Sequence, residues 1–416
     1  MWGIGDFSRL IISTNYYYGD KNIPTSGFSS LFGVQEDLIS RQTIMFDMPR
    51  AFHDDFATEA SLSWKFARMD YISPADTFSR HDQNSISLIN RWAWFPGWSP
   101  SWNPAGQLTL RSGFDYSFIQ LDSTEIGERS RHDGGIYLTA EYRPARYLEV
   151  APSVKAVFTS MGAGEITLIP KLGLLWNISD SLILKNNYFR SFKFPDFEDL
   201  YWTGEGGFHE ATGNPDLRPE DGWGGDIGVV WRAGIMVLES VAFVQWMRDS
   251  IHWFSDSGAW RPENVGEAVF FGLDESIRFN IPVSIGPVRI ISPSFSYKYL
   301  RSYLLSFGYT FASDKRIPYN PLFTIGGSLD IVWITRSQNN GSLLISAHYE
   351  SIRYEDRANL TELQPYLLLN ATFNQAINEY LSVFGSLRNI LNTSYESFYR
   401  YPMPGINLTM GMRVQF

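Results

Sequence analysis

Apolar and polar residues alternate with a period of two along most of the chain, which is the pattern of β-strands with two different faces. The clearest case is the stretch from Ile406 to Phe416, where apolar side chains occupy every second position and polar or small residues lie between them. The same alternation is found at 107–116, 136–142 and 343–350. The pattern therefore predicts an all-β protein whose sheet separates an apolar from a polar environment.

The alternation predicts eighteen antiparallel strands, and many of them run to ten residues or more. Strands of soluble sandwiches are mostly about five or six residues long, whereas tilted strands of about 9–11 residues cross a bilayer. The fold class expected is therefore an antiparallel transmembrane β-barrel. The eighteen strands are expected at 8–18, 39–49, 56–67, 85–95, 106–121, 134–143, 147–158, 165–177, 181–191, 222–232, 235–254, 267–281, 287–300, 318–335, 341–351, 365–376, 379–389 and 405–416.

The connections between these strands alternate in length. Tight turns are expected at 143–146, 177–180, 232–234 and 376–378, and long loops at 192–221, 255–266, 301–317 and 352–364. Bacterial outer-membrane barrels carry short turns on the periplasmic rim and long loops on the outer rim. This places the long loops outside the cell, with 96–105 as one connection that is long for its expected periplasmic position.

Composition supports this interpretation and excludes others. Aromatic residues make up 16% of the chain, with 14 Trp, 22 Tyr and 30 Phe, and no run of 18 uncharged apolar residues occurs. Helical membrane spans are thereby excluded, and the aromatic rings belong either in a large core or in girdles at a bilayer interface. The net charge of −10 argues against nucleic acid as a partner, because no basic stripe can release counterions. The first residues, MWGIGDFSRL, have no signal-peptide pattern, so any export signal is expected outside this chain.

Three stretches, in this order, together resemble the TonB-dependent outer-membrane receptors. NNYFRSFKFPDFEDLYW followed by GNPDLRPEDGWGGDIGVVW is similar to a barrel motif of that family. RPENVGEAVFFGLDESIRF (261–279) resembles its Asn-x-Gly-x-Ala-x-x-x-Gly-x-Glu strand, although Asp274 and Glu275 shift the acidic position by one. LRNILNTSYESFYRYPMPGINLTMGMRVQF resembles the family's ending, with an Asn-rich turn, Pro-Gly and a final strand closing on Phe416.

The resemblance implies a receptor that takes up cobalamin or a ferric siderophore across the outer membrane and contains no catalytic cofactor. The family's barrel has 22 strands and an N-terminal plug, so residues 1–416 are interpreted as a partial barrel that lacks the plug and the first strands. The implied partners are outer-membrane lipid, the TonB-ExbB-ExbD system acting through the missing plug, and the barrel-assembly machinery acting on the last strand. The implied oligomeric state is a monomer. Two alternatives stay open: a passive porin-like channel, and a truncated barrel without function.

The residues of the family motif have an ordinary role in turns. Proline fixes φ, glycine reaches conformations closed to other residues, and asparagine can bond its own backbone. We therefore expect GNPDLRPE (213–220) to fold the base of an outer loop rather than to contact ligand. The residues assigned to this structural class are Gly213, Asn214, Pro215, Leu217, Pro219, Glu220, Pro404, Gly405 and Phe416.

Aromatic residues in the expected outer loops are the candidates for ligand binding. Their rings offer rigid contact area at low entropic cost, which suits a bulky planar or macrocyclic ligand. The alternative for Trp253, Phe254 and Tyr399 is a place in the outer interfacial girdle. The candidate set is Tyr201, Trp202, His209, Trp253, Phe254, Trp260, Tyr399 and Tyr401.

Signals for catalysis and for metal binding are weak. The six histidines are scattered without the spacing of a zinc site, and no nucleophile elbow or phosphate-binding loop occurs. An outer-membrane enzyme would need a serine or aspartate near His252 or His348 at one rim. The expected acidic loop 68–84 carries Asp70, Asp76 and Asp82 beside His81, at spacings that match no calcium loop. We therefore expect no enzyme, no metal site and a solvated loop at 68–84.

Overall fold

The computed structural model describes residues 2–4, 8–24, 32–49, 55–73, 77–95, 107–161, 166–203, 211–256, 259–306, 315–356 and 358–415. Nearly all the regular structure in these ranges is antiparallel strand, with one short helix, α1 (Phe197–Tyr201). The chain forms two compact units: 1–176, 187–225 and 246–267 make the first, and 177–186, 226–245 and 268–416 make the second. Among the described residues, no helix is long and apolar enough to cross a membrane.

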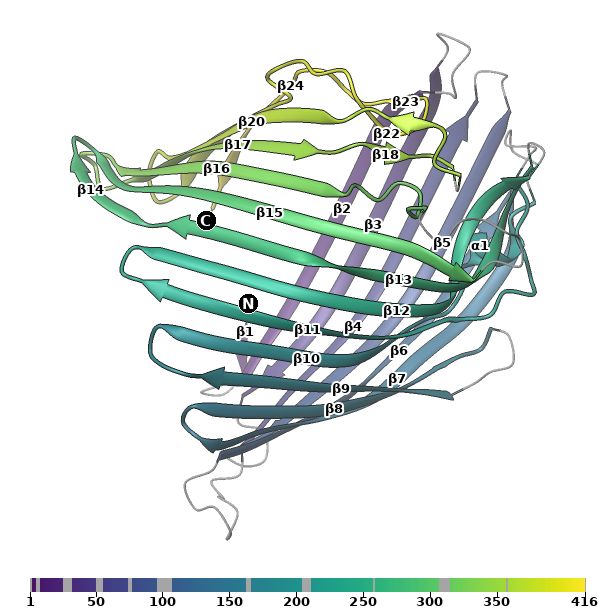
Figure 1. The fold of residues 1–416 in the computed structure, drawn as a ribbon, viewed down its shortest axis with the longest axis horizontal. Coiled ribbons are helices and arrows are strands. Elements are labelled where there is room, and N and C mark those ends of the chain that lie inside the picture. Colours follow the sequence, from purple (N-terminus) through teal and green to yellow (C-terminus); the bar gives the residue numbers. More distant parts are fainter. Residues whose placement is uncertain are drawn as a thin grey trace. The chain divides into compact units, whose positions relative to one another are not determined.

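The first unit contains the N-terminal strands, each paired with the next along the chain. In Figure 1 β2 to β7 lie side by side in purple to blue. The pairing of β4 with β5 runs without a bulge from Phe56 opposite Trp94 to Ile72 opposite Phe78. The strands are β1 (Trp2–Ile4), β2 (Ser8–Pro24), β3 (Phe32–Met48), β4 (Phe56–Ile72), β5 (Phe78–Trp94), β6 (Gln107–Ser123), β7 (Gly127–Ala145), β8 (Leu148–Thr159) and β9 (Ile166–Asn177).

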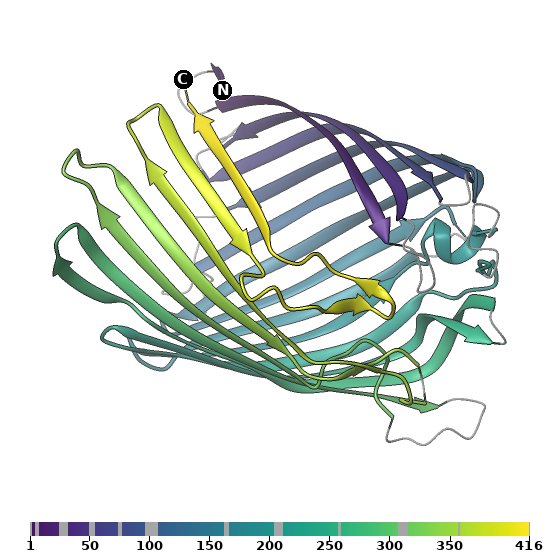
Figure 2. The ribbon, with the colours of Figure 1, turned by 90° about the horizontal axis from the view of Figure 1, so that it is seen from above.

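The second unit contains the C-terminal strands. Figure 2 shows β15, β16, β17, β20, β21 and β24 next to one another in green to yellow. These strands are β14 (Ile281–Ile285), β15 (Val288–Ser306), β16 (Phe323–Ile334), β17 (Asn340–Glu350), β20 (Tyr366–Ala376), β21 (Leu381–Arg388) and β24 (Asn407–Val414). Two short hairpins lie in the connections, β18 (Arg353–Tyr354) with β19 (Glu362–Leu363) and β22 (Glu396–Phe398) with β23 (Tyr401–Pro402). Residues of β10 (Leu182–Lys193), β11 (Glu220–Ala233), β12 (Met236–Asp256) and β13 (Ala259–Phe279) are shared between the two units.

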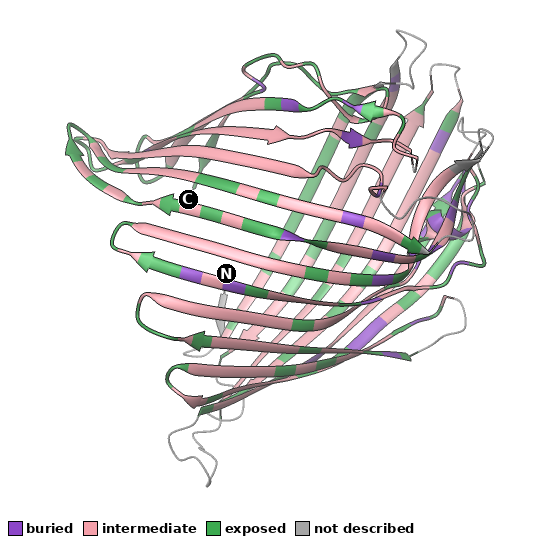
Figure 3. Ribbon diagram, viewed as in Figure 1, coloured by how far each residue is buried: buried purple, intermediate pink, exposed green. Residues whose placement is uncertain are grey.

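The strands have one apolar face that no other part of the described chain covers. In β7 Ile136 and Leu138 are 67% and 52% exposed, and in β24 Met410 and Met412 are 74% and 71% exposed. Most strand residues are of intermediate burial (Figure 3), as expected for a sheet one side chain deep on each side. Large exposed apolar surface of this kind marks contact with lipid. We call this side the apolar face.

The opposite side, which we call the polar face, carries ion pairs between strands that are adjacent or separated by one strand. Arg111 of β6 binds Glu141 of β7 at 2.7 Å, and Lys155 of β8 binds Asp115 of β6 at 2.6 Å. Lys185 and Glu239 form a similar pair in the second unit. Cross-strand pairs of opposite charge stabilise the register, and their side chains keep this face wet.

The eighteen expected strands are all present. Besides them, the large sheet of 20 strands contains only the three-residue β1 and the five-residue β14 among the described residues. The tight turns are also where the alternation predicted them, for example at 146–147 and 234–235. The all-β antiparallel prediction is therefore confirmed.

Two expected loops are wrong, and a third, 301–317, is shorter than expected because β15 continues to Ser306. Residues 255–266 were expected to form a loop, but β12 extends to Asp256 and β13 begins at Ala259. Residues 68–84 were also expected to form a loop, but β4 extends to Ile72 and β5 begins at Phe78. Both hairpins continue beyond the expected apolar stretch, because backbone pairing tolerates polar side chains where strands project past the bilayer. Four of the expectations fall outside the described residues: those for Asp76, His209, Phe416 and the long connection 96–105.

Candidate ligand-binding site

The GNPDLRPE segment is packed directly against α1 in the first unit. A Cβ atom on Gly213 would lie 2.7 Å from each of three backbone atoms, Leu200 C, Tyr201 N and Trp202 N. The amide of Gly213 donates to the Trp202 carbonyl at 2.8 Å, and the next amide donates to the Asp199 carbonyl at 2.7 Å. Glycine is therefore required here by close approach of two backbone segments.

Asn214 links this turn to β13. Its Oδ1 accepts from the amide of Asp216 at 3.2 Å, closing an Asx-type turn around Pro215. Its Nδ2 donates to the carbonyl of Pro262 at 3.0 Å. Leu217, the apolar residue of the motif, is buried with 9% of its surface exposed.

The end of the motif is attached to β12. Glu220 accepts from the amide of Ile251 at 2.7 Å and from the Ser250 hydroxyl at 3.2 Å. Asn264 accepts from the amide of Arg218 at 2.8 Å through Oδ1, and its Nδ2 donates to the Asp249 carbonyl at 2.7 Å. Within the connection between β10 and β11, the segment thus holds the helix, β12 and β13 together as one base.

Asp199 fixes one of the candidate aromatics to this base. Its side chain is only 8% exposed, and it accepts from its own helix start, the Asp196 amide, at 3.1 Å. The other carboxylate oxygen accepts from the indole Nε1 of Trp253 at 3.0 Å. Burial and the neighbouring Asp196 and Asp199 raise the pKa of Glu198 on the same helix. The result is an acidic, rigid support for Trp253.

The helix also lies against the ends of β5, β6 and β7. The Arg131 guanidinium is 5.2 Å from the centre of the Phe197 ring, and that of Arg129 is 4.6 Å from the centre of the Tyr201 ring. The Trp202 indole stacks on the His81 imidazole with centroids 6.0 Å apart and planes 14° apart. The indole Nε1 of Trp202 is buried and has no hydrogen-bond partner.

The structure therefore brings three of the candidates together around α1: Tyr201, Trp202 and Trp253. Phe254 is the residue after Trp253 in β12, and its ring contacts that of His252, with centroids 5.9 Å apart. Trp260 forms a parallel bridge with Ala211 and is 37% exposed, which makes it the most accessible of the five. We call these five residues the α1 aromatic cluster.

A second cluster lies in the loops of the second unit, and the sequence predicted only part of it. The amide of Tyr319 donates to the Tyr354 carbonyl at 2.8 Å, and the Tyr319 ring is 5.2 Å from that of Phe398. Arg353, which is 5% exposed, donates to the carbonyl of Glu396 at 2.7 Å. Three loops far apart in the sequence are thus joined, and we call this group the three-loop cluster.

The predicted candidates Tyr399 and Tyr401 belong to the three-loop cluster. The Arg400 guanidinium lies 5.0 Å from the centre of the Tyr399 ring, and Tyr401 pairs with Phe398 across the small hairpin. Burial raises the pKa of the Tyr401 phenol. Burial and the nearby Glu355 carboxylate raise the pKa of Tyr319 to about 12.

The Pro404-Gly405 pair is held by the Asn-rich turn that precedes it. Asn389 Nδ2 donates to the Pro404 carbonyl at 3.2 Å, and Asn392 Oδ1 accepts from the Ile406 amide at 3.0 Å. A Cβ on Gly405 would lie 2.4 Å from Asn392 Oδ1. The two asparagines adopt φ values of +50° and +51°, a conformation that asparagine tolerates better than most residues.

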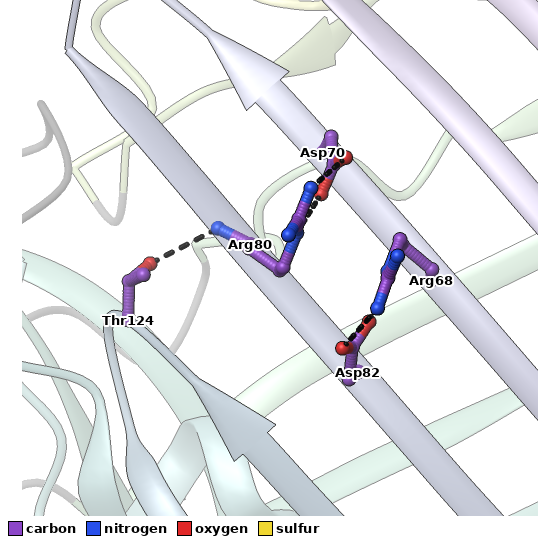
Figure 4. A network of polar contacts seen from close by, with 5 residues as sticks. All are labelled: Arg68, Asp70, Arg80, Asp82 and Thr124. Carbon is purple, nitrogen blue, oxygen red and sulfur yellow. Dashed lines mark hydrogen bonds and ion pairs between the residues drawn. The ribbon is translucent and has the colours of Figure 1, made fainter.

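The acidic residues of the 68–84 segment form ion pairs (Figure 4). Arg68 binds Asp82 through two hydrogen bonds of 2.7 Å, and Arg80 binds Asp70 in the same way. Both pairs join β4 to β5 on the apolar face, beyond Trp64. Within the described ranges no group of three or more His, Asp or Glu residues is arranged to hold a metal ion. The segment is a charge-paired hairpin rather than a solvated loop.

One serine lies beside a histidine at the outer end of β12. Ser250 Oγ is 3.1 Å from His252 Nε2 and 3.2 Å from Glu220 Oε1. In a catalytic triad the acid orients the histidine and leaves the serine free to attack. Here the carboxylate binds the serine itself, which is 6% exposed, so the arrangement is that of a structural contact. His348 contacts Glu350 at 3.2 Å.

Comparison with known proteins decides the family. The family described as "TonB dependent receptor-like, beta-barrel" matches residues 3–390. The chain belongs to this family. It therefore contains the family's β-barrel, and the apolar and polar faces described above are the outer and luminal faces of that barrel.

Vitamin B12 transporters are among the proteins similar in sequence to this chain. It is 24% identical over 333 residues to BtuB of Photobacterium profundum, covering 76% of this chain and 48% of the relative. It is 24% identical over 279 residues to BtuB of Vibrio vulnificus, covering 65% and 40%. The chain thus spans about half the length of the curated relatives it matches.

Solved structures with the same fold are also transport receptors. The ferric enterobactin receptor PfeA of Pseudomonas aeruginosa superposes with a TM-score of 0.73 at 14% identity, over 100% of this chain and 69% of the other. The hemophore receptor HasR of Serratia marcescens superposes with a TM-score of 0.74 at 12% identity, over 100% and 70%. At these identities the likeness concerns the fold.

Proposed function

We propose that this receptor takes up a scarce, bulky ligand across the outer membrane, with cobalamin as the first candidate and a ferric siderophore as the second. The observation that supports this is the combination of a TonB-dependent receptor barrel with two clusters of aromatic rings, in its long connections and in the strand ends beside them. Relatives similar in sequence include vitamin B12 transporters, which favours cobalamin.

The outer clusters suit a large ligand with flat surfaces. Trp260 offers an accessible indole, and the three-loop cluster offers phenol rings beside the Arg400 guanidinium. Rings and guanidinium groups contact a macrocycle over a wide area without much loss of conformational entropy. Trp202 and Trp253 in the first cluster and Tyr319 in the second are held by stacking, a hydrogen bond or a ring contact, so part of each cluster is formed before ligand arrives.

Transport itself would depend on the rest of the receptor. In our proposal the ligand binds the outer loops, and the TonB-ExbB-ExbD system then moves a plug domain that residues 1–416 do not supply. The chain is a monomer in the outer membrane, folded there by the barrel-assembly machinery acting on β24.

Uptake in a host that lacks its own cobalamin receptor tests the proposal. The complete coding region around this chain is expressed, and uptake of radiolabelled cobalamin is compared with uptake of a ferric siderophore, with and without TonB. We expect TonB-dependent uptake of cobalamin. Uptake of the siderophore alone would make a ferric siderophore, and not cobalamin, the ligand. Entry of both compounds without TonB would indicate a passive channel and overturn the proposal.

Trp260→Ala tests the binding surface in the same strain. The variant removes an accessible ring without leaving a buried cavity, so we expect weaker cobalamin binding with an unchanged amount of folded receptor. Tyr147→Ala is the matched control, since Tyr147 is a 53% exposed aromatic in the tight turn between β7 and β8. Equal losses in both variants would contradict a role of the outer loops.

A further inference from the structure

One arginine of β15 lies on the apolar face. Side chains at every second position of a strand lie on the same face, so Arg301 shares a face with Phe295, Tyr299, Tyr303 and Leu305. Phe295 and Leu305 are each 50% exposed, as is typical of a lipid-facing surface. Charged side chains on such a face are rare, and they point to an ionic partner at the membrane interface.

The surroundings of Arg301 form an aromatic girdle. The Tyr303 ring contacts Phe271 of β13 with centroids 6.1 Å apart, and the Tyr299 ring contacts Phe323 of β16 at 5.6 Å. These rings lie where β15 approaches its outer loop and β16 returns from it. Tyrosine and phenylalanine at this level mark the height of the lipid headgroups.

Arg301 has no carboxylate partner among the described residues. Its guanidinium carbon lies 5.1 Å from the centre of the Tyr303 ring, and its Nε is buried without a hydrogen-bond partner. Its charge interacts with the phenols of Tyr299 and Tyr303, and the hydrogen bond to Tyr299 is the largest contribution. Three other arginines on the same face differ, because Arg68, Arg80 and Arg190 each bind an aspartate through two hydrogen bonds.

A second guanidinium reinforces the positive charge at this place. Arg316 forms an antiparallel bridge with Tyr303, so the two side chains project to the same side of the sheet. Its guanidinium carbon lies 4.6 Å from the centre of the Tyr354 ring, and Nη1 donates to the Ile352 carbonyl at 3.3 Å. No ion pair with a described carboxylate is formed by Arg316 either. Two cations, each beside a tyrosine ring, therefore belong to the same side of the sheet.

We propose that Arg301, together with Arg316 and the Tyr299 and Tyr303 hydroxyls, binds the phosphate of an anionic lipid headgroup in the outer leaflet. A guanidinium offers a fork of donors that matches phosphate oxygens, and phenol hydroxyls can donate further hydrogen bonds. Anionic headgroups attract basic side chains at the membrane surface. The lipid supplies the counter-ion that the described protein residues do not provide.

Native mass spectrometry of the complete receptor in a nonionic detergent tests the proposal. The receptor is titrated with a diphosphorylated lipid A, and bound lipid is counted for the wild type, Arg301→Gln, Arg301→Lys and Arg289→Gln. Arg289 is the matched control, because it is an exposed arginine at the other end of the same strand and its removal changes net charge equally. We expect Arg301→Gln to weaken binding about tenfold, which corresponds to about 1.4 kcal/mol, because it removes the charge and the fork of donors. Arg301→Lys retains the charge without the fork and should give an intermediate loss.

Three results would overturn the proposal. Arg301→Gln could bind lipid as tightly as the wild type, or no more weakly than Arg289→Gln. A dephosphorylated glycolipid could bind equally well, which would leave the phosphate without a role. Inorganic phosphate could displace the lipid at similar concentration, which would make this a soluble-anion site. The assay does not involve the transported ligand, so its outcome is separate from that of the uptake experiment.

Discussion

Replacing Gly213 by alanine should detach the GNPDLRPE turn from α1 while leaving the strands intact. The added Cβ would lie 2.7 Å from three backbone atoms of residues 200–202. Because those atoms belong to the backbone and not to flexible side chains, the two segments have to separate by several tenths of an ångström. The hydrogen bonds from the amides of residues 213 and 214, at 2.8 and 2.7 Å, lengthen together.

The size of the effect follows from these contacts. Overpacking costs about 1–3 kcal/mol, and each of the two weakened hydrogen bonds contributes about 1 kcal/mol. A local loss of about 3 kcal/mol corresponds to roughly a hundredfold faster exchange of the two amides, because a factor of ten corresponds to about 1.4 kcal/mol. We expect this change by hydrogen-exchange mass spectrometry across 196–220, with weaker ligand binding and unchanged heat stability of the strands.

Gly385→Ala serves as the control for this experiment. The nearest atom to a Cβ at Gly385 is 3.9 Å away, so the extra methyl group fits. Its exchange and ligand binding should match those of the wild type. If Gly213→Ala also exchanges like the wild type at 196–220, close approach is not what requires glycine at this position.

Three further predictions concern the same clusters. Asp199→Ala leaves the Trp253 indole N–H and the Asp196 amide without their acceptor, so exchange at α1 should rise by a factor equivalent to about 1–3 kcal/mol, whereas Glu198→Ala should change it little. The pKa of Tyr319 is raised from 10.0 to about 12, so the stability that its protonated phenol contributes is complete below pH 10 and is lost as the pH rises through about 12. An ultraviolet titration of the wild type and of Tyr319→Phe checks this, and the prediction fails if the variant shows as many tyrosines titrating late as the wild type. Arg68→Gln should lower the stability of the β4–β5 hairpin more in low salt than in high salt, because its pair with Asp82 is partly exposed; a loss independent of salt, measured by thermal denaturation, would argue against an electrostatic cause.

Strand positions could be predicted from the sequence because the sheet separates two environments. Every second side chain faces lipid, and the resulting alternation at stretches such as 136–142 depends on local sequence alone. The sequence around 255–266 contains glycine, proline and charges, which are typical of loops. Its strands nevertheless continue, because outside the bilayer the backbone pairing no longer requires an apolar face. Local composition therefore gave the wrong boundary there.

The contacts of the clusters depend on register and on distant loops. The pairing of Arg68 with Asp82 requires that β4 and β5 be aligned, and no sequence pattern states that alignment. Tyr399 and Tyr401 could be proposed because they precede the last strand, but Tyr319 and Arg353 come from other loops and were missed. Their aromatic and basic character was the only available signal. The long separation along the chain concealed that they meet.

The three-loop cluster constrains how this receptor could acquire a new ligand. The loop with Tyr319 is bonded to the loop with Tyr354, and Arg353 ties that loop to residues 396 and 397. Exchanging a single loop with one from a relative would break contacts in the other two and leave polar groups without partners. A successful graft would have to move all three loops as a set. If this cluster binds the ligand as we propose, its specificity depends on all three loops together, and single substitutions at its edge would adjust affinity more readily than they would change the ligand.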